Sequence, residues 1–163
     1  MKVFQNNRYN IFNYKESSIF IEDRQPHSVL TIANLKNQLV VVRQMRKGIN
    51  NETVELPGGQ VEDNEKPMDA AKRELEEETG LIANQFIQIG NIYPLPSLIN
   101  RQITYFYTEN IVGYNKTIKQ DEDENIHVEY HKFPKVEYNL KTQKWRDQFL
   151  AYGVYICKLK GII

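Results

Sequence analysis

The segment at residues 57–80 constrains the fold most, because it places two adjacent glycines shortly before an acidic, helix-forming stretch. The apolar residues before it predict a short strand, and Gly58 and Gly59 allow backbone conformations that other residues resist. Pro67 suits the first turn of a helix, and Gly80 suits its C-terminal cap. The segment therefore predicts a strand, a Gly-rich loop and a helix in succession.

Apolar spacing assigns an inward face to this helix. Within residues 68–79 we expect Met68, Ala71 and Leu75 to point into the core, with Ala70 as a further candidate.

Three glutamates share the other face of the predicted helix. Glu74, Glu77 and Glu78 stand at positions i, i+3 and i+4, so their carboxylates are neighbours and repel one another. A hard divalent cation with oxygen ligands offsets such repulsion, and Mg²⁺ binds proteins through carboxylates together with substrate phosphates. We therefore expect Mg²⁺, with Mn²⁺ as an alternative, and a diphosphate substrate. The competing interpretation is a solvated acidic helix with Lys72 and Arg73 as ion-pair partners.

The remaining patterns predict an α/β protein. A helical spacing of Trp145, Phe149, Tyr152 and Ile156 predicts a helix from Thr142 onward whose apolar stripe is core or interface. Apolar runs bounded by turn residues predict strands at residues 28–33, 38–43, 53–56, 86–89, 103–107 and 126–130, the first two forming a hairpin. Strands and helices in this order predict a mixed sheet with helices packed on it.

Composition argues against nucleic acid and membranes as partners of this chain. The 163 residues carry 21 Lys and Arg against 21 Asp and Glu, so no net charge draws the chain toward nucleic acid or an anionic membrane. No apolar run is long enough to cross a membrane, and the N-terminal stretch lacks the apolar core of a signal peptide. The single cysteine, Cys157, fits a reducing compartment, so we expect a cytoplasmic protein.

The first 25 residues are rich in aromatic side chains and contain a strand-like alternation at residues 18–21. So short a segment cannot bury Phe4, Tyr9, Phe12 and Tyr14 by itself. We therefore divide the chain into a strand segment at residues 1–25 that forms a homodimer and a single domain at residues 26–163.

The helix segment also resembles a known family. Gly59, Glu65, Arg73-Glu74-Leu75, Glu77-Glu78 and Gly80-Leu81 match the signature of the Nudix hydrolases at every fixed position. The resemblance extends over about residues 29–133. It implies an α/β/α sandwich with a mixed central sheet and a catalytic helix after the Gly-rich loop.

The resemblance also implies roles for the motif residues. Glu74 and Glu78 are the expected metal-ligand pair, with the carbonyl of Gly58 as a further ligand. Glu77 is expected to act as a ligand through water and is counted among the catalytic residues. The residues matching Arg73 and Glu65 orient the loop and the catalytic helix in the family.

Three features resemble the ADP-ribose and nucleoside-diphosphate-sugar pyrophosphatase branch. The strand pair before the motif carries Arg46 and Glu55, and Pro96 lies sixteen positions after Gly80. The resemblance implies that Arg46, Glu55 and Pro96 bind substrate, and a guanidinium suits phosphate because it gives bidentate hydrogen bonds. A glycine often follows this proline in the branch, whereas here Ser97 follows.

The acidic stretch at residues 121–124 resembles a loop that supplies the general base or an additional metal ligand in that branch. The resemblance favours Glu122 as the base and Glu124 as a ligand, although a slip of one residue would exchange them.

Together these features predict a hydrolase of a nucleoside diphosphate linked to a sugar, ADP-ribose first, yielding AMP and ribose 5-phosphate. A hydrolase of nucleoside triphosphates or dinucleotide polyphosphates is the alternative enzyme, and a nucleotide-sensing module without catalysis is the alternative class. That module commonly lacks a motif glutamate, and none is missing here.

Overall fold

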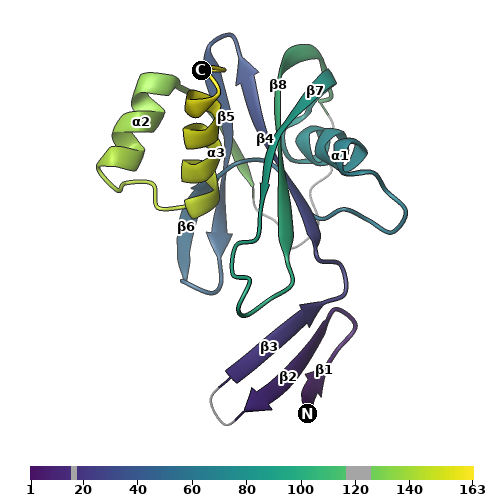
Figure 1. Cartoon of the computed structure of the whole chain (residues 1–163). Coiled ribbons are helices and arrows are strands. Elements are labelled where there is room, and N and C mark those ends of the chain that lie inside the picture. The colour runs from purple at the N-terminus through teal and green to yellow at the C-terminus, as the bar shows by residue number, and fades with distance from the viewer. Residues whose placement is uncertain (16–17, 117–125) are drawn as a thin grey trace.

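The computed structural model describes residues 1–15, 18–116 and 126–163, without the side chains of Tyr14 and Lys15. Its described part has a central mixed sheet with helices on both faces and a second, smaller sheet at the N-terminus (Figure 1). This arrangement confirms the predicted α/β sandwich.

One half of the central sheet is built on a parallel pair. Strand β4 (His27–Leu35) lies parallel to β8 (Gln102–Tyr114), and β7 (Leu81–Ile92) pairs antiparallel with β8 at the edge. These strands are longer than the sequence predicted. In β8 the predicted run at residues 103–107 is the buried first part of the strand, and in β7 the buried Leu81 and Ala83 precede the predicted run at residues 86–89.

The other half contains β5 (Gln38–Arg46), flanked by antiparallel β6 (Asn51–Glu55) and β9 (His127–Lys132). The predicted hairpin is confirmed, and its turn residues Lys36 and Asn37 both have positive φ, as tight hairpins require. Strand β5 pairs with β4 only through Asn34–Leu39 and Leu35–Gln38. The two halves therefore diverge from this turn.

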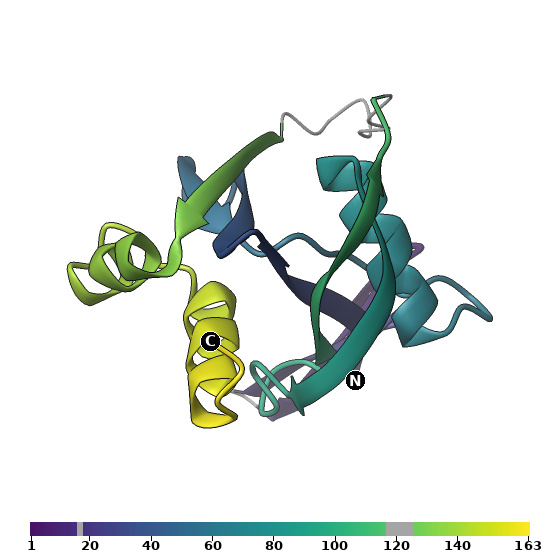
Figure 2. The ribbon, with the colours of Figure 1, turned by 90° about the horizontal axis from the view of Figure 1, so that it is seen from above.

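Helix α1 (Pro67–Thr79) covers one face of the sheet (Figure 2). It begins at Pro67 and ends at Gly80, whose φ of 73° suits glycine and whose N–H donates to the carbonyl of Glu76. Ala70, Ala71 and Leu75 are buried as predicted. The expectation for Met68 is wrong, because its side chain in the first turn is 40% exposed.

Helices α2 (Phe133–Lys141) and α3 (Gln148–Leu159) cover the other face. The sequence did not predict α2, whose short apolar pattern leaves only Val136 and Asn139 buried. The stripe beginning at Trp145 belongs to the core as expected, but Trp145 itself precedes α3 and packs from the loop. The helical spacing therefore placed the start of this helix too early.

The N-terminal sheet consists of β1 (Lys2–Gln5), β2 (Tyr9–Lys15) and β3 (Ser18–Asp23) in antiparallel order. It projects from one end of the central sheet (Figure 1). Its attachment runs through the loop between β7 and β8, where Ile21 N–H donates to the Leu98 carbonyl at 2.7 Å. In addition, Asp23 N–H donates to Asn100 Oδ1 at 2.7 Å.

Within the described residues, no helix is long and apolar enough to cross a membrane.

Asp147 caps α3 and gives the fold a testable pH response. Its carboxylate accepts the Leu150 N–H at 2.7 Å. Burial raises the pKa of Asp147 to about 6, from an ordinary value of 3.8, against the opposing effect of that hydrogen bond. The folded state therefore binds the proton more tightly, so this contribution to stability is complete below pH 3.8 and is lost as the pH rises through about 6.

We expect Asp147→Asn to weaken this pH dependence while keeping a capping side chain. Between about pH 5 and about pH 8, the variant should lose about 1 kcal/mol less unfolding free energy than the parent. Urea unfolding at both pH values measures this difference. Asp69→Asn, which removes an exposed carboxylate of α1, is the control and should follow the parent.

Candidate active site

A cavity of about 990 Å³ collects most of the residues that the sequence predicted for a site. The predicted residues that line it are Arg46, Gly58, Arg73, Glu74, Glu77 and Glu78. The sequence did not predict the others, which are Arg8, Gln25, Ser28, Gln44, Gly59, Gln60, Glu62, Asp63 and Arg101.

The Gly-rich loop continues beside β4 in a strand-like manner. Thr31 N–H donates to the Pro57 carbonyl at 2.9 Å, and Val29 N–H donates to the Gly59 carbonyl at 2.8 Å. The Gly58 carbonyl between them accepts no hydrogen bond from any described residue. A carbonyl oxygen that accepts no hydrogen bond from the described residues fits the predicted role of Gly58 as a metal ligand.

Both glycines are needed for close approaches. A Cβ at Gly58 would lie 2.1 Å from the Val29 carbonyl oxygen, and its φ of 154° is a conformation that other residues rarely adopt. A Cβ at Gly59 would lie 2.4 Å from Oε1 of Glu74. On the same loop, Gly58 N–H donates to Glu78 Oε2 at 2.8 Å. The loop is therefore fitted to two carboxylates of α1.

Arg73 joins the loop to the helix with all five of its N–H groups. Its Nε and Nη2 donate to the two oxygens of Glu65, both at 3.0 Å, and Nη2 also donates to the Gln60 carbonyl at 2.8 Å. Its Nη1 donates to Glu74 at 2.8 Å and to Glu77 at 3.0 Å. These contacts raise the pKa of Arg73, with the Glu65 bonds as the largest cause, and they lower the pKa of Glu65.

This network weakens the repulsion between the motif glutamates on which the expectation of a cation was based. Arg73 offsets part of the repulsion between Glu74 and Glu77, so repulsion alone does not require a cation. Within residues 1–15, 18–116 and 126–163, no three acidic, histidine or cysteine side chains already gather as a metal-binding group. The fit to a hard cation therefore rests on the type of donors lining the cavity, which are carboxylate oxygens and the Gly58 carbonyl.

Arg46 is held at the cavity by Glu55. Its Nε donates to Glu55 Oε1 at 2.7 Å, and its Nη2 donates to Oε2. The Glu55 side chain is 14% exposed and that of Arg46 is 50% exposed, so the guanidinium is the accessible partner. Glu55 does not line the cavity, although it holds Arg46 there, and its predicted contact with substrate stays a prediction.

The remaining predicted residues lie elsewhere. Glu65 holds Arg73 without lining the cavity. Pro96 is exposed in the loop between β7 and β8 and does not line the cavity either. Glu122 and Glu124 fall outside the described residues, so their roles stay predictions, as does substrate binding by Pro96.

Sequence reasoning missed two arginines, Arg8 and Arg101, that line the same cavity. Arg8 lies between β1 and β2, and Arg101 directly precedes β8. Neither belongs to a local motif, and only the docking of the N-terminal sheet brings them together. Both arginines form an ion pair with Asp23, and this shared contact is visible in the structure but not in the sequence.

We expect Gly59→Ala to displace the Glu74 carboxylate, because the new Cβ would overlap it while the backbone accepts alanine. The hydrolysis that the sequence predicts should fall by about a hundredfold, as misplacement of a site group by about 1 Å can cost. Stability to urea should stay within about 1 kcal/mol of the parent, because a flexible side chain can move aside. Steady-state kinetics and urea unfolding measure the two effects.

Gly48→Ala is the matched control, since a Cβ at Gly48 meets no atom within 4 Å. Unchanged hydrolysis in the Gly59 variant would contradict the importance of this close approach.

Comparisons with known proteins identify relatives of this chain. The family model of the NUDIX domain matches residues 23–152. An ADP-ribose pyrophosphatase of Bacillus subtilis (strain 168) is 27% identical over 92% of this chain and 89% of its own length. A methanol dehydrogenase activator of Bacillus methanolicus is 33% identical over 63% of this chain and 56% of its own length.

An ADP-ribose pyrophosphatase of Saccharomyces cerevisiae is 28% identical over 80% of this chain and 63% of its own length. Among solved structures, one described as an ADP compounds hydrolase has a TM-score of 0.82 at 17% identity, covering 99% of this chain and 91% of that one. At that identity the likeness concerns the fold. The domain match, which covers most of the chain, decides the family: this protein belongs to the Nudix hydrolases and is related to the ADP-ribose pyrophosphatases.

Proposed function

We propose that this protein hydrolyses the diphosphate bond of a nucleoside diphosphate linked to a sugar in a Mg²⁺-dependent reaction. ADP-ribose is the first candidate, with AMP and ribose 5-phosphate as products. The observation that carries the proposal is one cavity lined by the three motif carboxylates, the Gly58 residue and Arg46. The names of the relatives in Bacillus subtilis and Saccharomyces cerevisiae support the choice of substrate.

In this proposal Glu74, Glu77, Glu78 and the Gly58 carbonyl would hold Mg²⁺, which would neutralise phosphate charge and acidify water. Water forms a bond to phosphorus while the bridging phosphorus–oxygen bond breaks. Arg46, oriented by Glu55, binds a phosphoryl oxygen. Arg73 uses all its donors within the protein and therefore positions the helix rather than binding substrate.

The proton of the attacking water needs an acceptor. Glu74 and Glu77 both bond to Arg73, and Glu78 bonds to Gly58, so the motif carboxylates are engaged. We therefore keep Glu122 as the proposed base and Glu124 as a proposed ligand, with the exchanged assignment as the alternative.

We expect Glu78→Gln to lower kcat at saturating Mg²⁺ by at least about a hundredfold, because a metal ligand supplies several kcal/mol of charge stabilisation. The fold should persist, since glutamine can still accept the Gly58 N–H. Glu76→Gln is the control: Glu76 lies on the same helix, bonds to Asn115 and does not line the cavity.

The assay should use ADP-ribose, other nucleotide sugars, a nucleoside triphosphate and a dinucleotide polyphosphate with Mg²⁺ or Mn²⁺, with the products identified. Preferred cleavage of the triphosphate or the polyphosphate would replace the proposed substrate. Binding without turnover of any compound would favour the nucleotide-sensing module.

We also propose that the protein is a homodimer joined through the N-terminal sheet. Val3, Phe4 and Ile19 expose about half or more of their area on this sheet. Leu95 and Leu98 are exposed on the loop to which the sheet is attached. Exposed apolar side chains on a small projecting sheet and on its attachment loop favour an interface, and two-fold association of identical chains is the commonest assembly.

Sedimentation at micromolar concentration should give about twice the chain mass of 19.2 kDa. Phe4→Ser combined with Ile19→Ser should shift the protein toward the monomer, because both apolar contacts are lost. Ile49→Ser, at an exposed apolar position between β5 and β6, is the control and should leave the mass unchanged. A parent protein that sediments as a monomer would refute the dimer.

A further inference from the structure

The guanidinium groups that line the cavity differ in how much of their hydrogen-bonding capacity the protein uses. An arginine carries five N–H donors and no acceptor. Arg73 uses all five on protein acceptors, and Arg46 bonds to both oxygens of Glu55. Among the described residues, the guanidinium of Arg8 donates only through Nη2 to Asp23, and that of Arg101 only through Nη2 to Asp23 and Tyr9. Arg8 and Arg101 therefore each keep donors that no described residue accepts.

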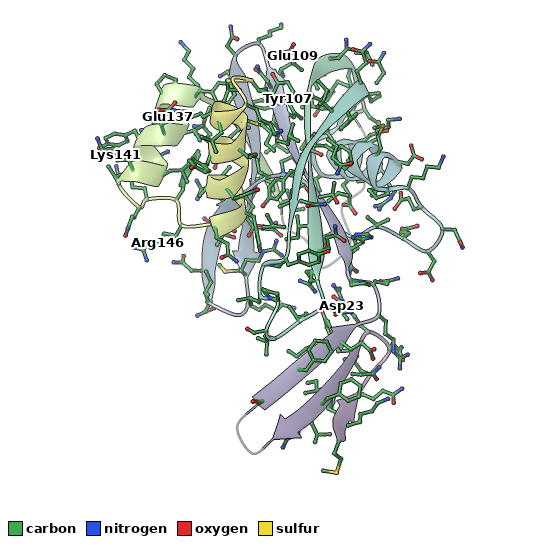
Figure 3. The ribbon with its side chains drawn as sticks, viewed as in Figure 1. Asp23, Tyr107, Glu109, Glu137, Lys141 and Arg146 are labelled. Carbon is green, nitrogen blue, oxygen red and sulfur yellow. The ribbon has the colours of Figure 1, made fainter. Side chains whose placement is uncertain are left out.

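Asp23 holds the two guanidinium groups side by side. Arg8 Nη2 lies 3.3 Å and Arg101 Nη2 lies 2.6 Å from the same oxygen, Oδ2. The Asp23 side chain is fully buried at the junction of the N-terminal sheet and the central sheet (Figure 3). Its other oxygen accepts the Gln25 N–H at 3.1 Å. Both Asp23 oxygens are thus in use, and the two arginines cannot move apart without losing a shared partner.

Tyr9 supports the same arrangement. Its hydroxyl oxygen accepts from Arg101 Nη2 at 3.1 Å, and the guanidinium of Arg8 lies 5.0 Å from the centre of its ring. The tyrosine therefore helps to fix the orientation of both arginines.

The cluster retains a positive charge. Burial acts to raise the pKa of Asp23, but the hydrogen bonds from Arg101, Gln25 and Arg8 outweigh burial and lower it, so the carboxyl group is ionised. Two guanidinium charges against one carboxylate leave a single excess positive charge beside the cavity.

The protein also leaves specific donors of the pair unmatched. The Nε atoms of Arg8 and Arg101 are buried and have no acceptor among the described residues. Nη1 of each arginine likewise has no acceptor within the described part of the chain. The buried Nε groups are out of reach of a ligand, whereas the Nη1 groups are not among the buried atoms and can donate to an incoming anion.

We infer that Arg8 and Arg101 form a phosphoryl-binding subsite that works without a divalent cation. The ligand is a phosphoryl group of the nucleotide, because two adjacent guanidinium groups match the geometry and charge of phosphate. The subsite takes one of the two linked phosphoryl groups of the substrate, while the carboxylates of α1, which line the same cavity, serve the other. This inference rests on the proposed function for the identity of the substrate.

The test measures binding of AMP in EDTA by calorimetry, with inorganic phosphate and adenosine as separate probes. Arg8→Gln should weaken AMP binding about tenfold, as expected for loss of one charge-assisted contact. Arg101→Lys keeps a positive charge beside Asp23 but loses the fork, and it should weaken binding similarly. Inorganic phosphate should compete with AMP, and adenosine should bind at least about tenfold more weakly than AMP.

Arg24→Gln is the matched control. Arg24 is exposed, follows Asp23 directly and does not line the cavity, yet its removal changes the net charge by the same amount. Urea unfolding of all variants confirms that each is folded. Equal AMP affinity in the Arg8 variant and the parent would overturn the subsite, and so would equal losses in the Arg8 and Arg24 variants. Equal affinity for adenosine and AMP would overturn it as well.

The experiments distinguish a failure of the arginine subsite from a failure of the proposed function. If the parent hydrolyses no diphosphate with Mg²⁺ but Arg8→Gln still weakens AMP binding in EDTA, the subsite stands and the proposed function does not. If ADP-ribose is hydrolysed but AMP binding in EDTA does not depend on Arg8, the proposed function stands and the subsite does not.

Discussion

Five hydrogen bonds from one guanidinium group, that of Arg73, hold the loop and the helix of the site in a single arrangement. They connect Glu65 and the Gln60 carbonyl, before the helix, to Glu74 and Glu77 on the helix itself. Arginine suits this position because its donors form a rigid planar fork, whereas lysine offers a point charge on a flexible stem. The carboxylates that face the cavity thus depend on a residue that is itself fully occupied by the protein.

The sequence predicted the local part of the site well. Residues from Gly58 to Gly80 are contiguous, so the turn, the helix start at Pro67, its end and the shared face of the glutamates follow from spacing alone. The role of Glu55 was harder to predict, because a carboxylate that holds Arg46 and one that touches a ligand look the same in a sequence. Met68 illustrates a related limit: at the first turn of a helix, an apolar side chain can lie beyond the edge of the core.

Tertiary placement is where prediction from the sequence ended. Arg8 and Arg101 are more than ninety positions apart, and each is surrounded by unremarkable residues, so neither spacing nor composition connects them. Helix α2 was missed for a similar reason: its few apolar positions become informative only once Val136 is packed against the core of the other helix and strands. In both cases the prediction failed because sequence patterns do not show which distant segments pack together.

The junction of the N-terminal sheet has a consequence for the order of folding. Strands β1, β2 and β3 are consecutive in the chain and each pairs with the next, so this sheet is built from local contacts. Its bonds to Asn100 and Arg101, in contrast, close a loop of 77 to 78 residues. Closing a long loop costs more entropy and comes late relative to local pairing. Completion of the cavity wall at Arg8 and Arg101 therefore depends on a long-range closure, as the pairing of β4 with β8 does, and local pairing alone does not supply it.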